Sequence, residues 1–157
     1  PYMIPIAMIK NSLRLLVLGL SFVSGAWAQD AAQPRLAALT LQAGMHNIRA
    51  EVARTPMQTQ TGMMFRQEMG TNDGMLFVFD QPEKRCFWMK NTLLPLSIAF
   101  IADDGSIVNL ADMQPKSEAS HCAAQPVRFA LEMNQGWFAK RGIKPGSKLQ
   151  GGPFGAR

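Results

Sequence analysis

The chain has 157 residues, 47% of them hydrophobic, and a formal net charge of +5, so we expect one domain with a packed core. Loss of an N-terminal segment that contains Lys10 and Arg14 would lower the net charge to +3. A positive charge this small and scattered argues against a nucleic-acid-binding surface.

Residues 1–28 have the pattern of a secretory signal peptide. With Met8 as the start, two basic residues precede an apolar run over 15–23 and the small-residue motif Ala26-Trp27-Ala28. The apolar run is too short to cross a bilayer, although an uncleaved N-terminal anchor is the alternative. We therefore predict a periplasmic or secreted protein with no membrane span after cleavage.

The remaining chain divides into a flexible tail over 29–35 and a single β-rich domain over 36–157. Alternating residues over 36–42 and 46–53 predict a hairpin with Ala43-Gly44 between its strands. The stretch Thr55-Pro56-Met57-Gln58 forms a capping box, which predicts a helix that runs to about residue 67. A glycine at position 62 either permits close packing or ends this helix early.

Most of the later segments are predicted strands. MLFVFD over 75–80 is continuously apolar, as in a strand buried on both faces. Asp103-Asp104-Gly105 predicts a hairpin turn, and Lys144-Pro145-Gly146-Ser147 has the composition of a type II turn. We expect an α+β fold: a compact, mostly antiparallel bent sheet or small barrel with one or two short helices.

Two cysteines, Cys86 and Cys122, lie in the part expected to be exported. An even pair in an oxidising compartment most simply forms one disulfide. The alternative is a thiol or metal site that uses His121 and Cys122.

Several segments match one pattern together: GMMFRQEM (62–69), GMLFVF (74–79), FWMKNTLLPLSIAF (87–100) and ALEMNQGWFAKRGIKPGSKL (130–149). In these segments the chain resembles the bacterial and archaeal family called domain of unknown function 192. The resemblance implies a compact β-rich domain and carries no established reaction. The family pattern often has Asp after the Pro-Leu pair, where this chain has Ser97.

A ligand-binding surface is the favoured functional hypothesis. If 86–91 is a strand, alternation puts Trp88 and Lys90 on one face, with Asn91 at its end. A tryptophan beside a cation can hold a sugar ring, an anionic ligand or a partner's side chain. With Arg66, these residues predict a non-enzymatic binding or accessory domain. The alternative is that Trp88 lies under the helix, Lys90 pairs with a Glu and Asn91 only fixes the turn.

Two alternatives use other residues. Glu51 and Glu132 lie within predicted strands, on their polar faces, and could serve an envelope-polymer hydrolase. Ion pairs with neighbouring arginines are the simpler interpretation of both carboxylates. Metal handling would use methionines, His121 and Cys122, but methionine more often fills core gaps. We expect no cofactor, a monomer, and a small ligand or an envelope protein as partner.

Overall fold

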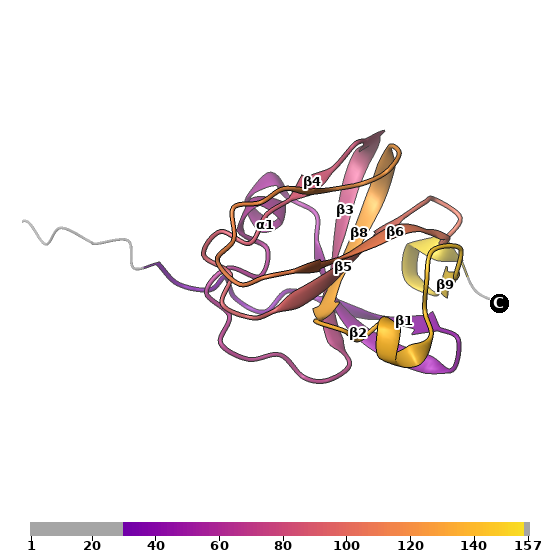
Figure 1. The fold of residues 1–157 in the computed structure, drawn as a ribbon, viewed down its shortest axis with the longest axis horizontal. Coiled ribbons are helices and arrows are strands. Elements are labelled where there is room, and N and C mark those ends of the chain that lie inside the picture. The colour runs from indigo at the N-terminus through magenta and orange to yellow at the C-terminus, as the bar shows by residue number, and fades with distance from the viewer. Residues whose placement is uncertain (1–29, 156–157) are drawn as a thin grey trace, which may run out of the picture.

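The structure is a computed structural model that describes residues 30–155, so the predicted signal peptide lies outside the described residues. Figure 1 shows the order of elements. They are β1 (Ala38–Ala43), β2 (His46–Ala53), α1 (Pro56–Thr61), β3 (Asp73–Glu83), β4 (Cys86–Phe87), β5 (Leu96–Ile101), β6 (Ile107–Met113), β7 (His121–Cys122), β8 (Val127–Asn134), η1 (Ala139–Arg141), β9 (Leu149–Gln150) and η2 (Gly152–Phe154).

Seven of these strands form one sheet in the order β6-β5-β8-β3-β2-β1-β9. Among the strands of residues 30–155, only β2 and β3 pair in parallel, because the segment that carries α1 crosses over between them. The sheet curls into a half-barrel, and β9 connects its edges: β9 pairs with β1, while Lys148 bridges to Ser106 before β6. The molecule is therefore mostly β, and the predicted α+β class overstates helices that span only six residues in α1 and three each in η1 and η2.

The predicted turns and caps are confirmed. Strands β1 and β2 pair from Ala43 and His46 onward, so the hairpin loop is Gly44-Met45. Gly146 has a φ of 89°, and Ser147 N–H donates to the Lys144 carbonyl, as a type II turn requires. The cap at the start of α1 is a full capping box.

Helix α1 ends at Thr61, earlier than residue 67, because Gly62 turns the chain with a φ of 49°. A Cβ on Gly62 would lie 3.2 Å from the Phe77 ring, so glycine also lets this turn approach β3 closely. The segment after α1 is therefore irregular chain that packs on the sheet.

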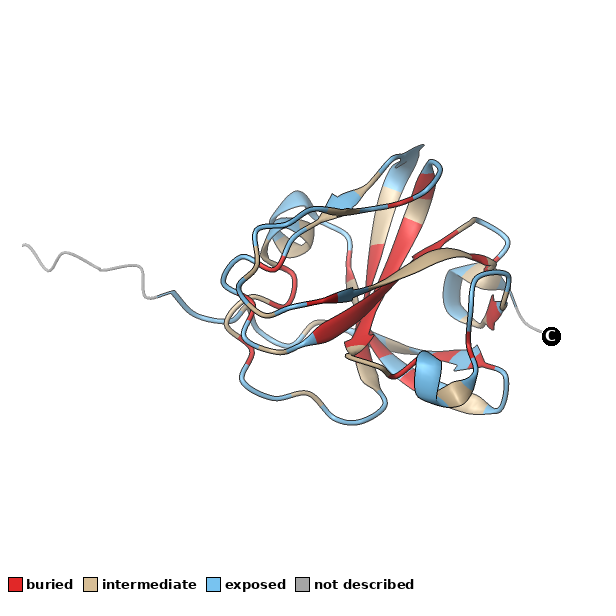
Figure 2. Ribbon diagram, viewed as in Figure 1, coloured by how far each residue is buried: buried red, intermediate tan, exposed pale blue. Residues whose placement is uncertain are grey.

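Both faces of the sheet are buried, and two hydrophobic clusters result (Figure 2). One face carries Leu76 and Leu131 and packs against Trp137 and Phe138. The other face carries Phe77 and Phe100 and packs with Met63 and Met89 from the segments after α1 and β4. Strands β5 and β8 in the interior of the sheet are therefore shielded from water on both faces.

The predicted strand over 86–91 ends after Phe87. Strand β4 pairs only with β7, with Cys86 opposite Cys122 and Phe87 opposite His121. Beyond it the backbone is irregular, and Asn91 has a φ of 54°.

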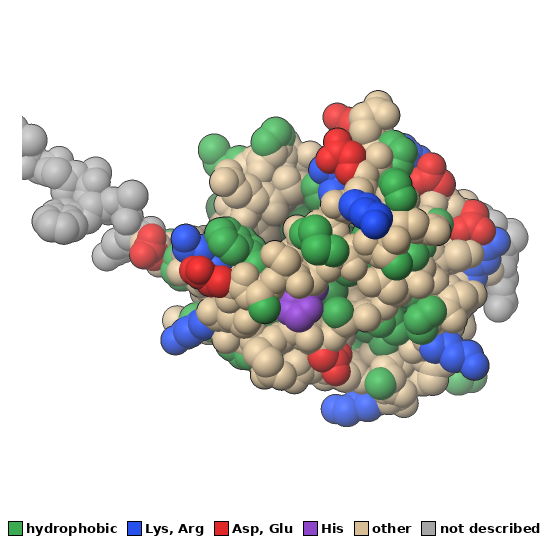
Figure 3. All heavy atoms as spheres, turned by 45° about the horizontal axis from the view of Figure 1, so that its top comes forward, with side chains coloured by type: hydrophobic (Ala, Val, Ile, Leu, Met, Phe, Trp, Pro, Cys, Tyr) green, Lys and Arg blue, Asp and Glu red, His purple; other side chains and the backbone are tan. Residues whose placement is uncertain are grey.

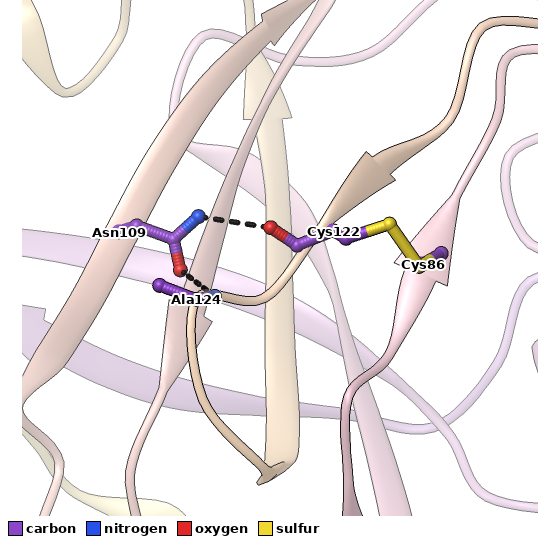
Figure 4. The surroundings of a disulfide bond; sticks show 4 residues. All are labelled: Cys86, Asn109, Cys122 and Ala124. Carbon is purple, nitrogen blue, oxygen red and sulfur yellow. Dashed lines mark hydrogen bonds between the residues drawn. A yellow bond between two sulfur atoms is a disulfide. The ribbon is translucent and has the colours of Figure 1, made fainter.

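Cys86 and Cys122 form the predicted disulfide, which holds β4 to β7. Asn109 of β6 fixes the same pair to the main sheet (Figure 4): its amide donates to the Cys122 carbonyl at 3.1 Å, and its side-chain oxygen accepts Ala124 N–H at 2.9 Å. A covalent bond and two hydrogen bonds thus anchor the β4–β7 pair.

Replacement of both cysteines with Ser should lower the free energy of unfolding by about 3 kcal/mol, because the bond closes a long loop. Urea denaturation of the double variant measures the loss. Treatment of the native protein with a reducing agent serves as the matched control. The reduced native protein should have the same urea midpoint as the double variant. If the double variant and the untreated native protein had the same midpoint, the disulfide would not stabilise the folded state.

Candidate functional site

Two buried carboxylates lie on the same face of the sheet. Glu51 of β2 is level with Met75 of β3, and Met75 is level with Glu132 of β8. Two strand spacings put their Cα atoms about 10 Å apart. Alternation assigned both residues to polar faces, but this face is covered, so Glu51 is 3% exposed and Glu132 4% exposed.

Glu51 is fully paired. It accepts hydrogen bonds from Arg66 (2.9 Å), Arg35 (2.9 Å) and the backbone N–H of Leu36 (2.7 Å). Burial acts to raise the pKa of Glu51, but the Leu36 N–H and the two arginines outweigh it, and the pKa lies below its ordinary value. Glu51 is therefore a carboxylate fixed in a structural ion pair.

Glu132 differs from Glu51 because no described residue bonds to its carboxyl group. Burial alone raises its pKa to about 8, with no hydrogen bond or cation from the described residues to oppose the shift. At neutral pH the side chain is mostly a neutral carboxylic acid. A carboxyl on a residue only 4% exposed, with a raised pKa and no bond from the described residues, marks a candidate functional group.

Glu132 lines a cavity of about 350 Å³ between the end of α1, the outer half of β3 and the segment around β4. We call this cavity the Glu132 pocket. Its polar lining includes Thr92 as well as Lys84 and Arg85, which precede β4. Figure 3, which brings the top of Figure 1 forward, shows acidic and basic side chains side by side on this face, with hydrophobic side chains among them. The cavity thus joins a buried acid to a surface of mixed charge.

Four aromatic side chains line the same pocket: Phe77, Phe79, Phe87 and Trp88. The Phe87 ring lies edge-on to Phe77, with centroids 4.9 Å apart, and 6.3 Å from the centroid of Phe79. Trp88 remains 46% exposed. The lining is therefore partly aromatic and partly polar, and the unpaired carboxyl of Glu132 is among its groups.

The structure separates the residues that the sequence grouped into one surface. Trp88 lines the Glu132 pocket, whereas Lys90 and Asn91 line a neighbouring hollow of about 410 Å³. Lys90 Nζ lies 5.1 Å from the centroid of the Trp88 ring, so these two are in contact. Arg66 is buried with Glu51 and lines neither hollow.

Several residues of the pocket were not singled out from the sequence. Lys84 and Arg85 form a basic pair directly before Cys86, the one sequence signal for them. Phe79 and Phe87 appeared to be ordinary strand residues. Pairing of β4 with β7 brings Phe87 over β3, and this contact between distant segments leaves no local pattern.

Ser97 forms a polar pair with Asp112. Its hydroxyl donates to Asp112, which is level with it on β6, and accepts the backbone N–H of Gly136 at 2.8 Å. The carboxylate that the resemblance implies at position 97 is thus supplied here from the adjacent strand.

The described residues offer little for a metal ion. No group of three or more His, Cys, Asp or Glu side chains over 30–155 could hold one. Both cysteines are in the disulfide, and Met63, Met75 and Met89 are buried in the core. Within the same range, no helix has the length and hydrophobicity needed to cross a membrane.

Two crystal structures resemble this chain over most of its length. One is a proposed transcription regulator from Sinorhizobium meliloti 1021, 36% identical, with a TM-score of 0.69 over 74% of this chain and 95% of that one. The other is a protein of unknown function from Novosphingobium aromaticivorans DSM 12444, 37% identical, with a TM-score of 0.69 over 76% of this chain and 94% of that one.

No curated protein matches the chain. The sequence profile of the family described as "Uncharacterized ACR" matches residues 38–151, which include every strand of the main sheet and the Glu132 pocket. The chain therefore belongs to the domain of unknown function 192 family.

Proposed function

We propose that the protein is an exported, non-enzymatic domain that binds a small ligand in the Glu132 pocket. The observation that carries this proposal is the buried carboxyl of Glu132, which lines a cavity and has no partner among the described residues. A ligand that supplies the missing polar contact would gain most of its orientation from this group.

Other features support the proposal. A volume of about 350 Å³ is within the range of small-molecule sites. The disulfide suits an oxidising compartment, in accordance with the signal peptide predicted over residues 1–28. The disulfide-bonded Cys86 itself lines the pocket, so the bond rigidifies one wall.

A fragment library screened by ligand-observed NMR tests the proposal. We expect hits whose affinity falls at least tenfold in Glu132→Leu, which keeps the side-chain bulk but removes the polar group. Glu118→Gln is the matched control, since Glu118 is exposed and lies outside the pocket. Fragments that bind both variants equally well would contradict a site at Glu132.

A hydrolase that acts on envelope polymers is the second candidate. A carboxylic acid that stays protonated at neutral pH is suited to general-acid catalysis, and Glu132 has this property. Its predicted partner Glu51 is held by two arginines, whereas Glu83 lines the pocket and pairs with Arg85 at 3.0 Å. Release of soluble fragments from purified cell-wall polymer, lost in Glu132→Gln, would favour this candidate over binding alone.

A further inference from the structure

The walls of the Glu132 pocket present aromatic rings next to a single buried acid. Phe77, Phe79, Phe87 and Trp88 line the cavity together with Glu132. Aromatic faces carry negative potential and attract cations, most strongly where water is excluded. The aromatic rings and the Glu132 carboxylate therefore both favour a positively charged ligand.

Two cations of the chain already contact aromatic rings of the pocket. The Arg85 guanidinium lies 4.1 Å from the centroid of Phe79, and Lys90 Nζ lies 5.1 Å from that of Trp88. The Phe77 and Phe87 rings take no part in the cation–π contacts within 30–155 and instead contact each other edge to face, with centroids 4.9 Å apart. The pocket thus combines an aromatic lining with an acid that no cation of the described residues pairs with.

Other charges around Glu132 are few or already balanced. The lining from α1 and its end, residues 59–64, has no ionisable side chain. From β3 and β4, Glu83 pairs with Arg85, and Lys84 is an exposed cation at the rim. On the same sheet face, Glu51 pairs with Arg35 and Arg66. Two cations of the lining oppose a cationic ligand: Lys84, which lies in solvent where screening is strong, and Arg85, whose charge is offset by Glu83.

We infer that the Glu132 pocket takes a small alkylammonium ion whose cationic head pairs with the Glu132 carboxylate beside the aromatic lining of the pocket. This inference rests on the proposed function and names its ligand class. The ammonium group supplies the counter-ion that Glu132 lacks, and its alkyl groups contact the aromatic walls. A neutral ligand of the same shape would leave the carboxyl to donate a hydrogen bond instead.

The two kinds of ligand predict opposite effects of pH. An ammonium ion binds the carboxylate form, so its binding releases a proton and tightens about tenfold from pH 6 to pH 7, below the Glu132 pKa of about 8. A neutral acceptor binds the acid form and weakens as the pH rises through 8. The direction of the change identifies the protonation state in the complex.

Isothermal titration calorimetry of the whole protein with choline and with its neutral isostere 3,3-dimethylbutan-1-ol tests the inference. We expect choline to bind at least tenfold more tightly than the alcohol at pH 8, with proton release measured from buffers of different ionisation enthalpy. Glu132→Gln should remove both the preference and the pH dependence, and Glu118→Gln should change neither. Trp88→Leu, on an exposed ring, should weaken choline less than Phe87→Leu.

The outcomes separate this inference from the proposed function. If the alcohol binds as well as choline and Glu132→Leu abolishes both, the pocket is a binding site and the ammonium ligand is wrong. If choline binds equally well to the native protein and to Glu132→Gln, or does not bind at all, the inference is overturned. Absence of any Glu132-dependent fragment would reject the proposed function as well.

Discussion

Glu132→Gln will stabilise the protein by up to about 5 kcal/mol above pH 8 and change its stability little near pH 4. The native side chain has a pKa of about 8 when folded against an ordinary value of 4.5, so the folded state holds a proton that the unfolded state releases. The free energy of unfolding of the native protein therefore falls as the pH rises from 4.5 to 8. Gln cannot ionise, so the variant avoids this loss.

Urea denaturation of both proteins between pH 4 and pH 9 measures the effect. Plots of the free energy of unfolding against pH for the native protein and Glu132→Gln should diverge as the pH rises. Glu118→Gln should follow the native curve. Parallel curves would mean that Glu132 titrates near its ordinary pKa and that the pocket admits enough water or counter-ions to solvate it.

Arg66→Met will lower the free energy of unfolding by about 4 kcal/mol at pH 7, because it leaves the buried Glu51 carboxylate without its buried cation. Arg66 is 5% exposed, whereas Arg35, the other partner, is about half exposed and screened by water. We expect Arg35→Met to lower the stability by less than about 1 kcal/mol.

A double-mutant cycle with Glu51→Gln separates the interaction free energy of the Glu51–Arg66 pair from the effects of the two single substitutions. The double variant Glu51→Gln/Arg66→Met should recover much of the loss, since no unpaired charge remains buried. Because the folded pKa of Glu51 is lowered, its contribution is complete above pH 4.5 and disappears as the pH falls through the folded pKa. If Arg66→Met has the same effect at pH 3 as at pH 7, its role is packing alone.

Features encoded by neighbouring residues were predictable. The capping box at Thr55, the hairpin around Gly44 and the turn at Gly146 each depend on three or four adjacent residues, and each is present. The early end of α1 was one of two outcomes expected for Gly62. The end of β4 was not predicted, since the apolar run from Cys86 to Met89 continues past the two residues that pair with β7.

The environment of the candidate site depends on distant segments. Alternation correctly separated Glu132 from Leu131 and Met133, but it treats the second face of a strand as open to water. Irregular chain after α1 and the disulfide-bonded β4–β7 pair cover that face here. Arg66 pairs with Glu51, and none of the residues that the structure describes pairs with Glu132, a difference that only the folded arrangement decides.

The pairing of β9 with β1 has a consequence for synthesis. Strand β1 is synthesised before the other strands of the sheet, and Leu149–Gln150, which cover its outer edge, are synthesised after them. Until then the hairpin of β1 and β2 exposes unpaired backbone groups and an apolar side, the features that recruit other chains into aggregates. A nascent chain that pauses before residue 149 would therefore need a chaperone, and a variant truncated after residue 147 would lose solubility before it lost most of its core.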